Sequence, residues 1–210
     1  MKLYSYWRSS CSWRIRIVLA HKRIPHDLTP VHLLRGGGEQ HGDAYASINP
    51  MRQVPSLVLD DGETITQSAA IIEYLEEAHP EPPLLPRALL ARARARELAA
   101  ITATGIQPLQ NLSVLREIDK LGGDRAAWGK MWLERGLAAM EAWAQPSPYL
   151  VGADVSVADV FVVPQLYNAR RFGIEVSAYP ALRRAEQACL ELPAFYDTRP
   201  EAQPDAQPGA

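Results

Sequence analysis

Apolar and polar residues in the first eighty positions alternate with the periods of strands and helices in turn. Residues 2–7 and 27–32 have the composition of strands, and residues 10–22 between them have the pattern of a helix. Two strands joined by one short helical crossover are parallel, so this order predicts a βαβ unit. A short helical turn is expected at residues 44–48.

A second group of elements follows this unit. Residues 56–59 and 63–66 flank the sequence Asp-Asp-Gly at positions 60–62, which favours a hairpin turn. Residues 67–79 carry the apolar stripe of an amphipathic helix, formed by Ile71, Ile72, Leu75 and Ala78. The predicted order of the first domain, residues 1–80, is therefore βαβ, loop, ββα.

Four prolines between positions 80 and 86 interrupt the pattern and predict a stiff linker at a domain boundary. Every periodic segment beyond it is helical, so residues 87–198 are expected to form an all-helical second domain. The predicted helices are residues 88–104, 125–144, 157–171 and 179–192. Ser156 and Asp159 fit a capping box at the start of the third helix. Residues 199–210 contain three prolines and few apolar side chains, so a disordered tail is expected there.

Composition and charge narrow the classes of function. The chain has 210 residues, 47% of them hydrophobic, as in globular proteins. Its 22 Lys and Arg against 24 Asp and Glu give a net charge of -2, which leaves no positive field to hold a nucleic acid. The apolar runs are far shorter than the roughly 20 residues that span a bilayer, and the first residues lack a signal-peptide core. We therefore expect a cytoplasmic protein with neither a nucleic-acid nor a membrane partner.

The cysteines and histidines predict neither a disulfide framework nor a metal site. Cys11 and Cys189 lie at opposite ends of the chain, and the five histidines lack the close helical spacing of zinc ligands.

The strongest candidate for a functional site is the segment 6–17, which runs from the end of a parallel strand into a helix. Ligands of open α/β sheets bind at this end of the strands, where free N–H groups and the helix dipole attract anions. Ser9 and Ser10 there either cap the helix or contact a ligand. Cys11 has no second cysteine in the spacing of a dithiol enzyme, which argues against thioredoxin-type redox chemistry.

Two further positions are candidates for the same ligand. Val54-Pro55 precedes the third strand, where a cis bond would turn a backbone amide and carbonyl toward a peptide-like ligand; an ordinary proline at a strand start is the alternative. Gln67-Ser68 opens the next helix, whose N-terminus suits a carboxylate, although capping alone would also explain Ser68.

On these residues the chain resembles the zeta-class glutathione transferases, among them the enzymes that isomerise maleylacetoacetate. The segment Ser9-Ser10-Cys11-Ser12-Trp13-Arg14 matches the signature of that class. Supporting stretches, which extend the resemblance over nearly the whole chain, are residues 49–55, 67–77, 105–113 and 168–172. The resemblance implies an α/β domain of thioredoxin-like fold followed by an all-α domain, with a homodimer as the working unit.

The resemblance also implies the ligands and the reaction. Glutathione is the expected cofactor, and its candidate contacts are Ser9, Ser10, Cys11, Gln40, Val54, Pro55, Gln67, Ser68, Gln107 and Asn111. The implied activity is the isomerisation of maleylacetoacetate to fumarylacetoacetate in phenylalanine and tyrosine catabolism. The thiolate adds, the former double bond rotates, and elimination returns glutathione. Ser9, Ser10 and Cys11 are the candidate catalytic residues.

The start of the first helix suits a thiolate. A thiol of pKa about 8.5 becomes mostly ionised at neutral pH when its pKa falls by about two units, or roughly 2.7 kcal/mol. A helix N-terminus contributes about 0.3–1 kcal/mol, up to about 2 when partly buried, and a hydroxyl hydrogen bond to a charged sulfur about 1.5–3 kcal/mol. Tyr6 is the competing donor, because other transferase classes use a tyrosine near the end of the first strand.

The implied substrate is a small anion, and arginine side chains are the expected contacts for its carboxylate groups. Arg8 and Arg14 flank the serines, and Arg171 matches an arginine of the family's second domain. Neighbouring helical positions point about 100° apart, so Arg170 and Arg171 cannot both face one cleft, and we favour Arg171. The alternative for each arginine is a solvated surface position.

Gln107 and Asn111 are four residues apart and would share one face of a helix kinked by Pro108. The alternative is that a helix ends at Gly105 and the amides cap a new one.

Other functions fit the same motifs. Conjugation or dehalogenation of small electrophiles such as alpha-haloacids needs the same thiolate without the returning elimination. Maleylpyruvate isomerisation is a close alternative, although Leu112-Ser113 matches the maleylacetoacetate pattern. A thiol transferase would have cysteine where Ser9 stands, and a ligand-binding protein without activity would be expected to lose the serines, Pro55 and Gln67-Ser68.

Overall fold

The computed structural model describes residues 1–207 of the chain. Its contacts divide the chain into two units. The first comprises Met1–Pro82 together with the segment that begins at Leu192, and the second is Pro83–Glu191. The division between Pro82 and Pro83 falls inside the proline-rich linker. The second unit ends at Glu191, whereas the sequence pattern placed the end of the helical domain at position 198. Residues 192–198 belong to the first unit.

A mixed four-stranded sheet forms the centre of the first unit, in the order β2-β1-β3-β4. The strands are β1 (Lys2–Ser5), β2 (Asp27–Pro30), β3 (Ser56–Val58) and β4 (Thr64–Thr66). β1 pairs parallel with β2 and antiparallel with β3, and β3 and β4 form an antiparallel hairpin. The predicted βαβ unit and the predicted hairpin are both confirmed.

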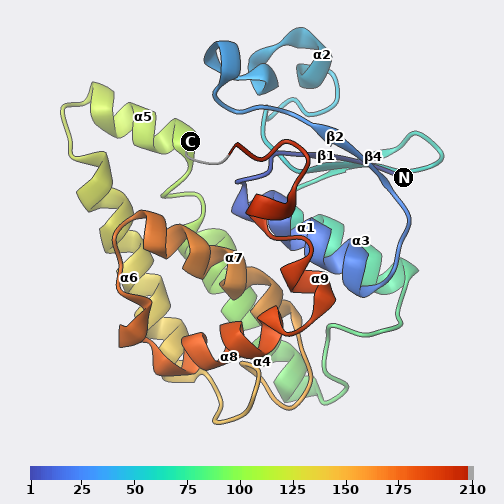
Figure 1. Cartoon of the computed structure of the whole chain (residues 1–210), viewed down its shortest axis with the longest axis vertical. Coiled ribbons are helices and arrows are strands. Elements are labelled where there is room, and N and C mark those ends of the chain that lie inside the picture. Colours follow the sequence, from blue (N-terminus) through green and yellow to red (C-terminus); the bar gives the residue numbers. More distant parts are fainter. Residues whose placement is uncertain (208–210) are drawn as a thin grey trace. The chain divides into compact units, whose positions relative to one another are not determined.

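Helices lie on both faces of this sheet. α1 (Ser10–His21) and α3 (Ser68–Ala78) lie on one face, and the short α2 (Asp43–Ala46) lies on the other (Figure 1). Two 3-10 turns, η1 (Arg35–Gly37) and η2 (Glu39–His41), precede α2. The apolar core between the sheet and the two helices is fully buried and includes Leu3, Ile15, Leu57, Ile71 and Leu75. This core fixes the starts of α1 and α3 relative to the strand ends.

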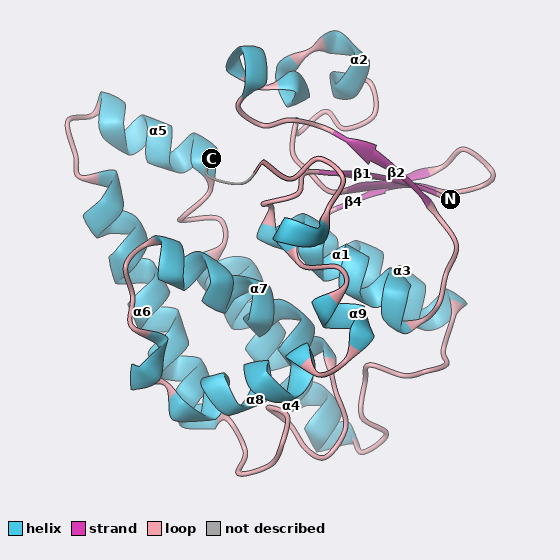
Figure 2. Ribbon diagram, in the orientation of Figure 1, coloured by secondary structure: helices cyan, strands magenta, loops and turns pink. Residues whose placement is uncertain are grey.

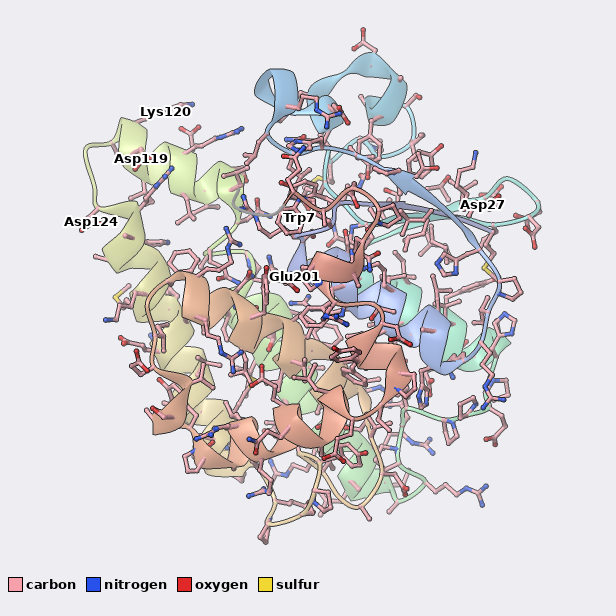
Figure 3. The ribbon with its side chains drawn as sticks, in the orientation of Figure 1. Trp7, Asp27, Asp119, Lys120, Asp124 and Glu201 are labelled. Atoms are coloured by element: carbon pink, nitrogen blue, oxygen red, sulfur yellow. The ribbon has the colours of Figure 1, made fainter. Side chains whose placement is uncertain are left out.

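The segment from Leu192 onward is ordered as far as residue 207. It contains α9 (Pro193–Tyr196), which packs on α1, and the 3-10 turn η5 (Pro200–Ala202). The indole Nε1 of Trp13 donates to Thr198 Oγ1 at 3.1 Å. Asp205 and Gln207 also contact Trp7 and His32 of the first unit, in the region where the sequence pattern predicted a disordered tail; residues 208–210 lie outside the described residues. Figure 3 shows Trp7 beside this segment.

The second unit contains helices and no named strand within Pro83–Glu191 (Figure 2). Its elements are α4 (Leu89–Ala100), the π-helical η3 (Ile101–Ile106), α5 (Leu112–Lys120), α6 (Arg125–Trp143), α7 (Val157–Arg171), η4 (Val176–Ala178) and α8 (Pro180–Leu190). The predicted fold class, an α/β unit followed by an all-helical one, is confirmed. The sequence pattern missed α5 and treated α4 and η3 as one helix. Among residues 1–207, no helix has both the length and the apolar character needed to cross a membrane.

The predicted capping box at the start of α7 is present. Asp159 is fully buried, and its carboxylate accepts from the backbone N–H groups of Leu150 and Ser156, each at 2.9 Å, and from the Ser156 hydroxyl. Burial raises the pKa of Asp159 to about 6, against the opposing effect of these donors. One side chain therefore holds both the first turn of α7 and the loop before it.

Asp159→Ala should lower the stability of the protein. The substitution leaves the N–H groups of Leu150 and Ser156 buried without their acceptor, and each such group costs about 1–3 kcal/mol, so the free energy of unfolding should fall by about 2–6 kcal/mol. Urea denaturation followed by circular dichroism measures the change. The control is Asp154→Ala, an exposed aspartate of the same loop, which should change stability by less than about 0.5 kcal/mol. A loss no larger than that of the control would contradict this role.

Candidate active site

The serine pair lies where β1 leads into α1. Ser9 is the N-cap of the helix, and its Oγ accepts from the backbone N–H of Ser12 at 3.2 Å. Ser9 is half-buried, whereas Ser10, the first helical residue, is buried. Because the Ser9 oxygen accepts in this contact, its hydroxyl hydrogen remains available to a ligand. Capping and ligand contact are thus compatible roles for Ser9.

The first turn of α1 is a favourable place for an anion. It contains no acidic residue, and the positive end of the helix dipole lies there. Arg8 is half-buried, with its guanidinium carbon 5.2 Å from the centre of the Trp7 ring. The thiol of Cys11 is half-buried and lies 3.5 Å from Nη1 of Arg14. The local chemistry therefore combines hydroxyl donors, a thiol and cationic groups.

Arg14 joins the starts of two helices. Its side chain is inside the protein, with 1% of the residue exposed, and burial lowers its pKa. Nη1 donates to the hydroxyl of Ser68, the first residue of α3, at 3.2 Å. Arg14 is therefore not a solvated surface residue, and its Nη1 is committed to groups of the protein at the serine site.

Gln67 has an unusual backbone conformation at the start of α3. Its φ of 69° lies in the left-handed region, which costs a residue with a side chain roughly 1–2 kcal/mol. Strained residues of this kind cluster at ligand sites, where the surrounding structure holds them in place. Gln67 is exposed while Ser68 is buried, so the two residues of the predicted pair face different surroundings.

The predicted cis bond between Val54 and Pro55 is present, directly before β3. Val54 is buried in an apolar cluster with Tyr6, Trp7, Val31 and Tyr45. Tyr6 is 4% exposed, and its ring meets that of His32 edge to face. A phenol ring packed in this cluster is a poorer candidate for a sulfur ligand than the half-buried Ser9.

Gln40 lies in η2 with a buried amide. Its Nε2 donates weakly to the carbonyl oxygen of Leu33 at 3.5 Å, and its Oε1 has no hydrogen-bond partner among residues 1–207. Gly38 lies directly beneath it, with φ of 112°, and a Cβ atom there would come within 2.5–2.8 Å of the Gln40 amide. A buried acceptor of this kind favours a ligand that donates a hydrogen bond.

The two arginines near the end of α7 differ in their contacts. Arg170 forms a bidentate pair with Glu186, at 2.6 and 2.5 Å, which raises its pKa. Arg171 is exposed, and its Nη1 donates to the side-chain oxygen of Asn168 at 3.3 Å. Arg170 is therefore committed to a carboxylate, and Arg171 as the substrate contact stays a prediction.

Gln107 and Asn111 do not share a helix face. Gln107 follows the π-helical turn, and Asn111 is the N-cap of α5, where its side-chain oxygen accepts from the backbone N–H of Ser113 at 3.2 Å. The helix is interrupted between them because Pro108 has no N–H to continue it and Asn111 favours a cap. The predicted shared face is wrong, and the capping alternative is correct for Asn111.

Comparison with known proteins identifies the family. Residues 8–78 match "Glutathione S-transferase, N-terminal domain" and residues 132–193 match "Glutathione S-transferase, C-terminal domain". The chain is 46% identical to "Probable maleylacetoacetate isomerase 2" of Drosophila melanogaster over 208 residues, 98% of this chain and 90% of the relative. A solved bacterial maleylpyruvate isomerase, described as a zeta-class transferase, is 40% identical, with a TM-score of 0.93 over 99% of this chain and 100% of that one. The chain belongs to the zeta class of glutathione S-transferases.

A second solved structure is a maleylacetoacetate isomerase from Anaeromyxobacter dehalogenans 2CP-1 with glutathione bound in its active site. It is 46% identical to the present transferase, with a TM-score of 0.88 over 98% of this chain and 97% of that one.

The predicted residues of the transferase fall into two groups. Within the first unit, the starts of α1 and α3 carry Ser9, Ser10, Cys11, Arg14, Gln67 and Ser68, η2 carries Gln40, and loops carry Arg8, Val54 and Pro55. Gln107, Asn111 and Arg171 belong to the second unit. Within residues 1–207, no group of His, Cys, Asp and Glu side chains is arranged to hold a metal ion.

One residue of the first unit was missed by sequence reasoning. Arg16 is 2% exposed, and it donates from Nη1 to Ser5 Oγ at 3.0 Å and to the Tyr6 carbonyl at 3.3 Å, and from Nη2 to the Trp7 carbonyl at 3.0 Å. The only signal for it in the sequence is a charged residue between two isoleucines on a buried helix. In the transferase this side chain holds the backbone that leads to Ser9.

Proposed function

We propose that this zeta-class transferase isomerises maleylacetoacetate to fumarylacetoacetate with glutathione as a recycled cofactor. The observation that carries the proposal is the available hydroxyl of Ser9 at the start of α1, in a first turn free of acidic residues. The names of relatives that match nearly the whole chain support the substrate.

Ser9 supplies the main hydrogen bond to the sulfur. Its hydroxyl is half-buried and therefore within reach of a ligand, and its oxygen is held in place by the Ser12 N–H. A hydroxyl bond to a charged sulfur contributes about 1.5–3 kcal/mol, and the helix N-terminus adds up to about 2 kcal/mol. Ser10 and Cys11 are neighbours that add weaker donors. Together these terms ionise the thiol at neutral pH without a general base.

The rest of glutathione is bound by groups at the edges of the two helix starts. Gln67 and Ser68 at the N-terminus of α3 suit a carboxylate of the tripeptide, and the backbone at Val54 and Pro55 suits its peptide groups. The free acceptor of Gln40 suits an N–H donor of the ligand. Gln107 and Asn111 of the second unit are proposed to complete this set.

The reaction proceeds by addition and elimination. The thiolate forms a bond to one carbon of the cis double bond, and the electron pair moves to the conjugated carbonyl as an enolate. The former carbon–carbon double bond is now single and rotates. The enolate electron pair then re-forms the double bond and expels the thiolate, which leaves the trans product. Arg8 and Arg171 are proposed to hold the substrate carboxylate and to stabilise the enolate.

A homodimeric state, a cytoplasmic location and a place in phenylalanine and tyrosine catabolism complete the proposal. They rest on the resemblance to the class.

An absorbance assay of maleylacetoacetate with and without glutathione tests the function. We expect turnover that requires glutathione and leaves its concentration unchanged, because elimination returns it. Maleylpyruvate is the competing substrate, favoured by the solved isomerase of that name with a TM-score of 0.93. Faster turnover of maleylpyruvate, or consumption of glutathione with an alpha-haloacid in the absence of isomerisation, would reject the assignment.

Ser9→Ala should raise the pKa of bound glutathione by about 1–2 units, since it removes one hydroxyl bond worth about 1.5–3 kcal/mol. Ultraviolet difference titration of the complex measures this pKa. Ser9→Gly separates the hydroxyl from the cap, because glycine costs a helix cap only a few tenths of a kcal/mol. Both variants should show the same shift, and Ser10→Ala should show a smaller one. An unshifted pKa in both Ser9 variants would assign the thiolate to another donor.

Gly38→Ala should weaken glutathione binding through Gln40. The new Cβ would displace the Gln40 amide, and the loss of one hydrogen bond corresponds to an increase of about five- to tenfold in Kd, measured by calorimetry. Gly37→Ala is the control for backbone strain, because Gly37 also has a positive φ, of 88°, but open space at its Cβ position. Equal affinities in the two variants would remove Gln40 from the binding site.

A further inference from the structure

Tyr6 and Trp7, which precede Arg8 and Ser9, have all of their backbone N–H and C=O groups in hydrogen bonds. The Tyr6 N–H donates to Ser12 Oγ at 3.4 Å, and the Tyr6 carbonyl accepts from the Ser9 N–H at 3.0 Å as well as from Arg16. The Trp7 carbonyl accepts from Arg16, and the Trp7 N–H donates to Oδ2 of Asp205 at 3.0 Å. The position of the turn that carries Ser9 is therefore set by these bonds.

Asp205 differs from the other partners in its origin and its charge. It lies 198 positions along the chain from Trp7, whereas the other groups that bond this turn come from the turn itself and from α1. It is also the carboxylate that offsets the buried cation of Arg16. Burial lowers the pKa of Arg16 to about 9, and the negative charge of Asp205 acts in the opposite direction.

The two residues after Asp205 contact further parts of the first unit. Ala206 packs against the apolar cluster that contains Tyr6, Trp7 and Val54. Oε1 of Gln207 lies 3.5 Å from Nε2 of His32. Nδ1 of His32 accepts from two backbone N–H groups of the following loop, at 3.2 and 2.9 Å, which leaves the ring proton on Nε2. Three consecutive residues thus contact the segments that lead to Ser9, Val54 and Gln40.

We propose that Asp205 is a positioning residue of the glutathione site, acting through the Trp7 amide and the Arg16 guanidinium on the turn that carries Ser9. The proposal rests on the proposed function, because it concerns the donor to the glutathione sulfur. Without the carboxylate, the Trp7 N–H loses its acceptor and Arg16 loses its counter-charge. The turn then relaxes, and the Ser9 hydroxyl no longer meets the sulfur in good alignment, so a larger share of bound glutathione stays protonated.

The experiment compares full-length Asp205→Ala, Asp205→Asn and Asp205→Glu with the native protein. Difference titration gives the pKa of the bound thiol, and initial rates give kcat at saturating glutathione and KM for glutathione. Asp205→Ala should raise the thiol pKa by about one unit, a tenfold loss of thiolate below that pKa, and lower kcat to match. Asp205→Asn keeps an acceptor but no charge and should show about half the shift. Asp205→Glu should restore most of the native pKa.

The control is Asp197→Ala, which removes the same charge from an exposed position of the same segment and should leave the thiol pKa and kcat unchanged. A native thiol pKa in folded Asp205→Ala, even with reduced thermal stability, would overturn the proposal, because a merely structural contact would lower stability alone. If Asp205→Ala does not fold, the same criterion applies to Asp205→Asn. A native protein without glutathione-dependent turnover would instead refute the proposed function.

Discussion

A buried guanidinium fixes the point at which β1 passes into α1. A cation removed from water costs several kcal/mol unless its N–H groups are bonded and its charge is offset. Arg16 meets this requirement with acceptors from the end of the strand, from Tyr6 and Trp7, and from the carbonyl of Thr198 at 3.1 Å. None of these acceptors can move without breaking a bond to the same side chain. The turn before Ser9, the end of β1 and the carboxyl-terminal segment are therefore held by the same side chain.

The same constraint gives the start of α1 its electrostatic character. The first turn has no acidic residue, so nothing there opposes the positive end of the helix dipole. Arg16 and Arg14 are enclosed, and the carboxylate of Asp205, which accepts from the Trp7 N–H, offsets part of the Arg16 charge. In the proposed function, a thiolate at the start of α1 would gain from the dipole and from a hydroxyl whose oxygen the cap holds in place, so a neutral serine would suffice without a general base.

Local signals in the sequence were enough for the strands, for most of the helices and for the serine turn, because periodicity and turn chemistry act over a few residues. They failed where the decisive contact is distant. Prolines after position 198 suggested a disordered tail, and no local pattern reveals that the Asp205 carboxylate accepts from the Trp7 N–H. Gln67 adopts a positive φ imposed by the packed unit, and its residue type gives no sign of it. Asn111 was misplaced because spacing alone suggested a shared face, while its side chain competes as a cap.

The two arginines that flank the serines, Arg8 and Arg14, differ in burial. Arg14 looked equivalent to Arg8 in the sequence, since both flank the same pair. In the folded unit, Arg14 bonds to Ser68 and to the Cys11 thiol, so it sets the relation between the starts of α1 and α3. These are the two places where a thiolate and a carboxylate of one tripeptide would bind, and a rigid cation between them favours both charges at once. Arg8 differs from Arg14 in being half-buried, with its guanidinium over the Trp7 ring, so of the two it is the better candidate for the proposed contact with a substrate carboxylate.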